Sequence, residues 1–177
     1  MRKLSKIGLT VLAGAGVFLI AAAIGPDTFR VERSRQIAAP PELVYAQIND
    51  LTRMKSWNPY ERKDPSLKGE FGARSEGIGA SYYWDSETMA TGCMTIVESK
   101  PDSLVSLRLE FEKPFKSTFT TDYVLRSTGG GTEVTWAMHG PANFVHKLMQ
   151  TAFILDLLIG RDLEDGLRNL GAQVEAH

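Results

Sequence analysis

The sequence has one cysteine, Cys93, and three histidines, which limits the chemistry available to it. A single cysteine cannot form an internal disulfide, and it cannot supply a cluster of thiolates for a metal ion. The histidines His139, His146 and His177 lack the His-x-x-x-His spacing of a zinc site, and no Cys-x-x-Cys occurs. We therefore expect neither a metal site nor a bound cofactor.

Basic clusters are also missing from most of the chain. There are 20 Lys and Arg residues against 21 Asp and Glu residues. Three of the bases, Arg2, Lys3 and Lys6, lie at the N-terminus, where residues 1–25 contain no acid. The rest of the chain is therefore mildly acidic, which argues against nucleic acid as a partner. A length of 177 residues suits one domain with a short appendage.

An uncharged apolar segment, Ile7 to Ile24, directly follows those three bases. A helix of about 18 residues is roughly 27 Å long, just enough to cross the hydrocarbon core of a bilayer. The basic tip predicts a cytoplasmic N-terminus with the domain on the far side of the membrane. We therefore expect a membrane anchor at residues 1–25 and a folded domain at residues 26–177.

Two other interpretations of this segment stay open. Ala21-Ala22-Ala23 is a candidate signal-peptide cleavage site, and cleavage there would release a secreted or periplasmic domain. The segment could also be a buried helix of the domain, although its glycines and alanine-rich tail would pack poorly in a core. Its length favours the uncleaved anchor, because signal peptides have apolar stretches of about 7–15 residues.

Five segments alternate apolar and polar residues with the period of two that predicts β-strands. They span residues 80–86, 91–99, 103–111, 116–126 and 132–139. The short connections between them carry turn residues, which favours antiparallel neighbours. We expect a further, edge strand at Phe29–Ile37. Residues 58–80 are rich in Gly, Pro and charge and predict a long loop.

Helical periodicity appears at both ends of the domain. Pro41 can begin a short helix that carries Val44 and Ile48. An apolar stripe from about Pro141 to Val174 predicts a single long amphipathic helix. A sheet with one apolar face must be covered, and only this helix is long enough to do so. The sequence thus predicts an α+β fold, a curved antiparallel sheet wrapped around a long C-terminal helix and preceded by a transmembrane helix.

Several short motifs, in their order and spacing, resemble the START-like (SRPBCC) superfamily of polyketide cyclase/dehydrase and lipid-transport proteins. The resemblance covers roughly residues 29–174 and implies the helix-grip fold, with a deep apolar cavity beneath the C-terminal helix. The superfamily includes lipid carriers, metabolite binders and cyclases, and no catalytic motif can be carried over. The motifs are Ala39-Pro40-Pro41, Trp57-Asn58-Pro59, Asp64-Pro65, Trp84, Gly92, Pro114-Phe115, Gly131–Trp136 and Ile159–Leu167.

Eleven residues are candidates for the wall of such a cavity, because ligand pockets are mostly apolar with few polar points. Asp156 is the polar one. It falls inside the apolar stripe, where an ionised carboxylate needs a partner or acquires a raised pKa. Asp156 is therefore the best candidate for a catalytic acid, although a structural bond to the sheet is the favoured explanation of its position. The other ten are Tyr82, Trp84, Leu107, Leu109, Phe119, Tyr123, Trp136, Met138, Met149 and Ala152.

Three functions remain open on the sequence. A membrane-tethered module that holds a lipid or other small hydrophobic ligand fits the expected cavity and the lack of a catalytic constellation. A polyketide cyclase- or dehydratase-like enzyme would need Asp156 in the cavity. A structural or interaction protein of the cell envelope would use residues 58–80 as its contact site. A cavity of a few hundred Å³ would favour ligand binding, whereas close packing throughout would favour the third function.

Overall fold

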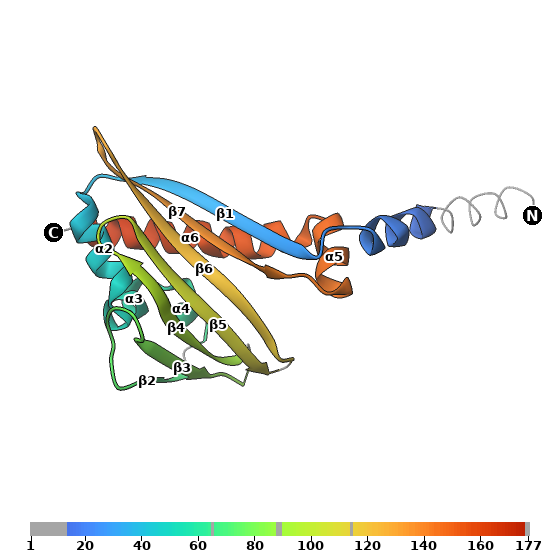
Figure 1. Ribbon diagram of the computed structural model, residues 1–177, viewed down its shortest axis with the longest axis horizontal. Coiled ribbons are helices and arrows are strands. Elements are labelled where there is room, and N and C mark those ends of the chain that lie inside the picture. The colour runs from blue at the N-terminus through green and yellow to red at the C-terminus, as the bar shows by residue number, and fades with distance from the viewer. Residues whose placement is uncertain (1–13, 65, 88–89, 114, 176–177) are drawn as a thin grey trace, which may run out of the picture.

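The computed structural model describes residues 14–64, 66–87, 90–113 and 115–175. Its centre is a seven-stranded antiparallel sheet in the order β1-β7-β6-β5-β4-β3-β2, which curves around the C-terminal helix (Figure 1). The strands are β1 Thr28–Ile37, β2 Lys68–Phe71, β3 Ser81–Asp85, β4 Thr91–Lys100, β5 Leu104–Lys113, β6 Ser117–Thr128 and β7 Gly131–Pro141. The helices are α2 Pro41–Asn49, α3 Leu51–Trp57, α4 Pro59–Lys63, α5 Phe144–Thr151 and α6 Ile154–Glu175.

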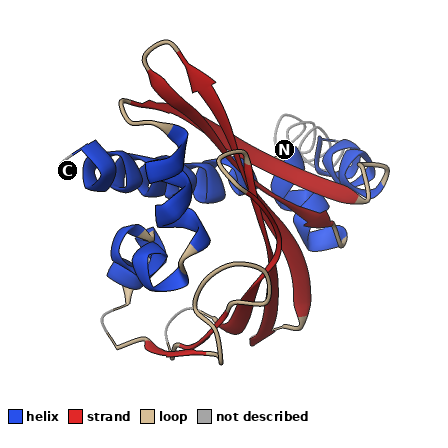
Figure 2. Cartoon of the chain, turned by 60° about the vertical axis from the view of Figure 1, so that its left-hand side comes forward, coloured by secondary structure: helices blue, strands red, loops and turns tan. Residues whose placement is uncertain are grey.

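The sheet confirms the predicted strands. Strands β3 to β7 follow one another as an antiparallel meander, and each overlaps one of the five segments with a period of two. Strand β1 forms one edge and pairs with β7 from Thr28 opposite Pro141 to Ile37 opposite Thr132. Helices α2 to α4 and α6 lie on one face of the curved sheet (Figure 2). These features give the helix-grip α+β fold.

The expectation of a long loop at residues 58–80 is wrong, because this segment contains α4 and β2. Asn58 begins α4 by accepting a hydrogen bond from the Tyr60 backbone N–H at 3.0 Å, and Pro59 occupies the first turn. Strand β2 pairs antiparallel with β3 and forms the other edge of the sheet. Its sequence, KGEF, does not alternate, so only its pairing with β3 defines it as a strand.

The expectation of one C-terminal helix is also wrong, because the helix is broken between α5 and α6. Phe153 adopts a φ of 57° at the break, a left-handed conformation that ends a helix. The Phe153 N–H bonds the Gln150 carbonyl at 3.0 Å, which tightens the last turn of α5. No glycine or proline stands at this point in the sequence, so no local signal predicts the break.

Helix α6 covers the concave face of the sheet and closes the core. Leu163, Leu167 and Leu170 are buried on its inner face. Gly166 lies against the ring of Trp136 on β7, where an added Cβ would overlap the ring. Gly160 lies against the Arg33 guanidinium of β1 in the same way, so this glycine permits the close approach of helix and sheet.

Residues 14–23 form a helix that projects away from the sheet (Figure 1). Its apolar side chains are largely exposed, for example Val17 and Ile20, and so is Ile24 directly after it. Among the described residues, no helix is long and apolar enough to span a bilayer. The predicted anchor begins at Ile7, so its first part, residues 7–13, lies outside the described residues.

We predict that Gly166→Ala lowers the free energy of unfolding by about 1–2 kcal/mol, because overpacking against Trp136 outweighs the gain in helix propensity. Urea unfolding followed by tryptophan fluorescence measures the change. The control is Gly129→Ala in a turn, where an added Cβ meets nothing within 4 Å, and it should be nearly neutral. A Gly166→Ala variant as stable as the wild type would contradict the packing described here.

Candidate functional site

A cavity of about 450 Å³ lies between the concave face of the sheet and helix α6. Strands β5, β6 and β7 provide most of the residues by which the sheet lines it, because their alternating residues place apolar side chains on the concave face. On β5, for example, Leu107, Leu109 and Phe111 face the cavity, whereas Arg108 and Glu110 point outward. Seven of the predicted residues line it: Trp84, Leu107, Leu109, Phe119, Tyr123, Trp136 and Met138.

The other four candidates lie elsewhere. Tyr82 is buried outside the cavity, where its hydroxyl donates to Glu61 Oε1 at 2.6 Å and burial raises its pKa. Met149 lines a neighbouring hollow of about 300 Å³. Ala152 and Asp156 line a shallow hollow on the outside, together with Arg33 of β1.

The expected place of Asp156 on the cavity wall is therefore wrong, although it does have the partner that its position demands. Arg33 Nη1 and Nη2 donate to its carboxylate oxygens at 3.0 and 2.9 Å, while Arg33 Nε donates to Glu164 Oε1 at 2.6 Å. The side chain of Asp156 is 56% exposed. Asp156 lies in the first turn of α6, on the side of the helix that faces Arg33 of the edge strand β1 and remains open to solvent. The hydrogen bonds from Arg33 lower the pKa of Asp156, so it is an ionised structural group.

A row of aromatic rings runs along one side of the cavity. The Trp84 and Phe111 centroids are 5.7 Å apart, Phe111 and Phe119 are 5.8 Å apart, and Phe119 and Phe29 are 5.1 Å apart. The His146 ring of α5 ends the row, 5.7 Å from Phe29. Such contacts hold rings in place beyond their burial. The sequence interpretation missed Phe29, Phe111 and His146, although Phe111 shares the alternation of Leu107 and Leu109.

The cavity also has a polar cluster that the sequence interpretation missed, formed by Tyr60, Lys63 and Asp162. The Lys63 ammonium donates to Asp162 Oδ1, and its nitrogen lies 5.3 Å from the centroid of the Tyr60 ring. Burial and the neighbouring Asp162 carboxylate, which accepts a hydrogen bond from Tyr60, raise the pKa of Tyr60. At neutral pH Tyr60 is therefore a neutral phenol beside the Lys63–Asp162 ion pair.

Asp162 belongs to an acidic run, residues 161–165, which by sequence alone predicts a solvent-exposed helix face. It nevertheless follows Leu155, Leu158 and Ile159 at spacings of seven, four and three residues, which places all four on one side of α6. This spacing could have identified Asp162. Tyr60 and Lys63 could not be found in the same way, because the short helix that carries them was predicted as loop.

The cluster can bind the polar end of a ligand. Its ion pair has no net charge, so it favours neutral hydrogen-bonding groups such as a hydroxyl or a carbonyl over isolated charges. Deeper in the cavity, Thr121 accepts a hydrogen bond from Trp136 Nε1 at 2.6 Å and donates to the Ala137 carbonyl at 3.0 Å. Across the described ranges, His, Cys, Asp and Glu form no group of three or more suited to a metal ion.

The profile of the family described as polyketide cyclase / dehydrase and lipid transport matches residues 28–175. The chain belongs to this family. Membership confirms the resemblance drawn from the sequence motifs and accounts for both the helix-grip fold and the cavity that it encloses. No functionally curated protein is significantly similar in sequence.

Solved structures at low sequence identity share the fold of this family member. A protein from Chromobacterium violaceum is 18% identical with a TM-score of 0.60, and the match covers 85% of this chain and 99% of that one. A protein from Rhodobacter sphaeroides is 17% identical with a TM-score of 0.60, covering 86% and 95%. The protein Ara h 8.0201 is 9% identical with a TM-score of 0.58, covering 85% and 99%. These likenesses show the fold alone.

We predict that Asp156→Asn lowers the free energy of unfolding at pH 7 by less than about 1 kcal/mol, because the ion pair is largely exposed. The pKa of Asp156 is lowered in the folded state, so its contribution is complete above its ordinary value of 3.8 and is lost as the pH falls through the folded pKa. The difference from the wild type should therefore shrink and vanish as the pH is lowered further below 3.8.

Urea unfolding across this pH range makes the measurement. The matched control is Asp165→Asn, because Asp165 pairs with Arg168 on the same helix at 2.6 Å and does not connect α6 to the sheet. A difference between wild type and Asp156→Asn that is independent of pH would contradict the assignment.

Proposed function

We propose that this protein binds a small hydrophobic ligand in the cavity, with one hydrogen-bonding group of the ligand at the Tyr60–Lys63–Asp162 cluster. The observation that carries the proposal is the cavity itself, about 450 Å³ within walls that are mostly apolar. Protein interiors otherwise contain few voids larger than a water molecule, and ligand pockets span about 300–1,000 Å³. A volume of this size supports ligand binding over a purely structural role.

The walls suit an elongated amphiphile, such as a lipid with a hydroxyl or carbonyl group. Burying its apolar surface contributes roughly 25 cal/mol per Å², which supplies most of the affinity. The polar cluster orients the ligand, because a polar group left without a partner in such a cavity costs about 1–3 kcal/mol. A lipid is thus the ligand class that we propose, and the binding needs no metal or cofactor.

We also propose that residues 7–24 tether the domain to a membrane, with the N-terminus in the cytoplasm and the domain on the other side. The basic residues before this segment and the exposed apolar side chains of residues 14–24 support this arrangement. Cleavage after Ala23 is the alternative and would leave the same cavity in a secreted or periplasmic domain.

A polyketide cyclase- or dehydratase-like activity is the second candidate, and one observation favours it. Asp162 and Tyr60 bring a carboxylate and a phenol together at the cavity wall, as acid–base chemistry on a bound substrate requires. Incubation with a linear poly-β-ketone and detection of water loss by mass spectrometry tests this activity. Asp162→Asn should abolish the loss of water, whereas Asp156→Asn should leave it unchanged.

We predict that Met94→Trp weakens the binding of N-phenyl-1-naphthylamine, an apolar fluorophore, at least tenfold. Met94 on β4 is half-buried and lines the cavity, so the larger side chain occupies the space that the probe needs. Leu104→Trp is the matched control, because Leu104 lies on the opposite face of the sheet. Fluorescence titration gives both affinities. Wild-type protein freed of bound lipid that shows no saturable binding would contradict the proposed function.

We predict that Asp162→Ala weakens the binding of dodecan-1-ol about tenfold, because a hydrogen bond to a charged group contributes roughly 1.5–3 kcal/mol. Binding of dodecane, which has no polar group, should hardly change. Displacement of N-phenyl-1-naphthylamine measures both ligands, and Asp165→Ala on the same helix serves as the control. Equal losses for the alcohol and the alkane would show that Asp162 supports the cavity wall without contacting the polar end of the ligand.

A further inference from the structure

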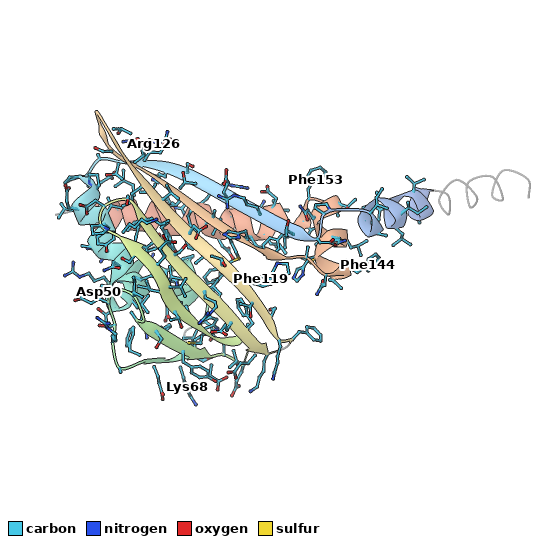
Figure 3. The ribbon with its side chains drawn as sticks, in the orientation of Figure 1. Asp50, Lys68, Phe119, Arg126, Phe144 and Phe153 are labelled. Carbon is cyan, nitrogen blue, oxygen red and sulfur yellow. The ribbon has the colours of Figure 1, made fainter. Side chains whose placement is uncertain are left out.

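Six large apolar side chains are exposed at the corner where α5 meets α6. We call this the elbow surface: Phe144, Val145, Phe153, Ile154, Leu157 and Leu158, which are between 44% and 79% exposed. Phe144 and Phe153 point outward at the end of the molecule from which the N-terminal helix leaves (Figure 3). Apolar side chains gathered in this number on a small protein mark a surface that contacts a partner or a membrane.

The elbow surface is fixed to the base of the apolar N-terminal segment. Asp27 makes both connections: its carbonyl accepts from the Ala142 N–H at 2.7 Å, and its carboxylate accepts from Lys147 Nζ at 2.6 Å. Asp27 follows Ile24 by three residues, which reach at most about 10 Å. The C-terminal end of the helix at residues 14–23 must therefore lie close to the elbow surface.

The cavity opens toward the same corner. Leu158 belongs to the elbow surface and also lines the cavity. His146 on α5 lines both the cavity and the neighbouring hollow of about 300 Å³, and Phe111 and Phe119 are shared in the same way. The two hollows therefore adjoin each other at Phe111, Phe119 and His146, which makes the second hollow the candidate path from the elbow to the cavity.

Two lysines stand along this path. Lys113 and Lys116 line the second hollow together with Phe115, which is 82% exposed. Lysines beside exposed apolar groups match the anionic headgroups and acyl chains of a lipid surface. A protein partner would explain the apolar side chains equally, but not the apolar helix that leaves from the same place.

We propose that the elbow surface lies on a lipid bilayer beside residues 14–24, and that the cavity exchanges its ligand with the bilayer through the second hollow. The first part rests on the exposure of the elbow side chains and on the bonds by which Asp27 holds the elbow near residues 14–24. The second part rests on the proposed function, because it needs a ligand in the cavity. The elbow thus places the opening of the cavity at the membrane.

Site-specific labels on the full chain test the first part. A Cys93→Ser background carries single cysteines labelled with the fluorophore NBD at position 153 on the elbow, position 20 in the N-terminal helix and position 97 on β4. Val97 is 41% exposed and serves as the matched control for an apolar surface residue away from the elbow. The protein is reconstituted into vesicles of phosphatidylcholine with phosphatidylglycerol. Emission and quenching by doxyl-labelled lipids are then measured.

The proposal expects a blue shift and at least a twofold quenching at position 153, with neither at position 97. A label at 153 that stays in water while the label at 20 is quenched overturns the elbow proposal and leaves the tether in place. Quenching at 153 without quenching at 20 supports the elbow and overturns the tether. A blue shift at 153 without vesicles, together with a doubled mass in light scattering, assigns the surface to a second copy and overturns the proposal.

Ligand exchange tests the second part. Phe153→Asp and Leu157→Glu each place a charge on the elbow without touching the cavity wall, and they are examined separately in case one fails to fold. Each should slow the transfer of N-phenyl-1-naphthylamine from vesicles to the protein at least tenfold, while the equilibrium affinity stays within twofold. Val97→Asp is the control. Unchanged transfer rates in both variants overturn the exchange route. A wild-type protein that does not bind the probe at equilibrium overturns the proposed function.

Discussion

The packing of α6 against the concave face of the sheet is the contact on which the rest of the structure depends. Its C-terminal half is in close contact with the sheet, because Gly166 admits the ring of Trp136 and Leu163, Leu167 and Leu170 are buried there. Its N-terminal half covers the cavity. The fold thus combines a closely packed end, which supplies stability, with an open end that leaves space for a ligand.

Arg33 and the Tyr60–Lys63–Asp162 cluster show how the two sides of this helix are used. On one side, Arg33 of the edge strand holds Asp156 and Glu164 in exposed ion pairs. On the other side, Lys63 and Tyr60 bring Asp162 to the cavity wall. Carboxylates six residues apart on one helix therefore have different roles, one as a connection between helix and edge strand and one as a polar point in an apolar cavity.

The break at Phe153 produces the exposed apolar corner beside the cavity. Because Phe153 is left-handed, α5 does not continue the axis of α6, and apolar side chains of both helices are exposed where the two helices meet. Asp27 ties this corner to the base of the N-terminal segment. If the elbow lies on a bilayer as we propose, a ligand of low solubility in water would benefit from this arrangement, because the cavity lies close to the apolar side chains of the elbow.

The sequence by itself determined the edge strand β1, the strands β3 to β7, the start of α2 and the family, because each depends on patterns within a few residues or on the order of motifs. It also identified seven of the residues that line the cavity, since alternation along β3, β5, β6 and β7 places one face inward. It could not find α4, which has only five residues, or β2, which is defined only by its pairing with β3.

Only the tertiary structure decided the roles of Asp156 and Asp162. A helical wheel gives the direction of each side chain relative to the helix, but it does not say which side of the helix meets the edge strand and which covers the cavity. That is settled by where α6 lies on the sheet, and its position depends on the left-handed residue Phe153 and on the contact between Gly166 and Trp136. Both are properties of the assembled chain, and no local pattern encodes them.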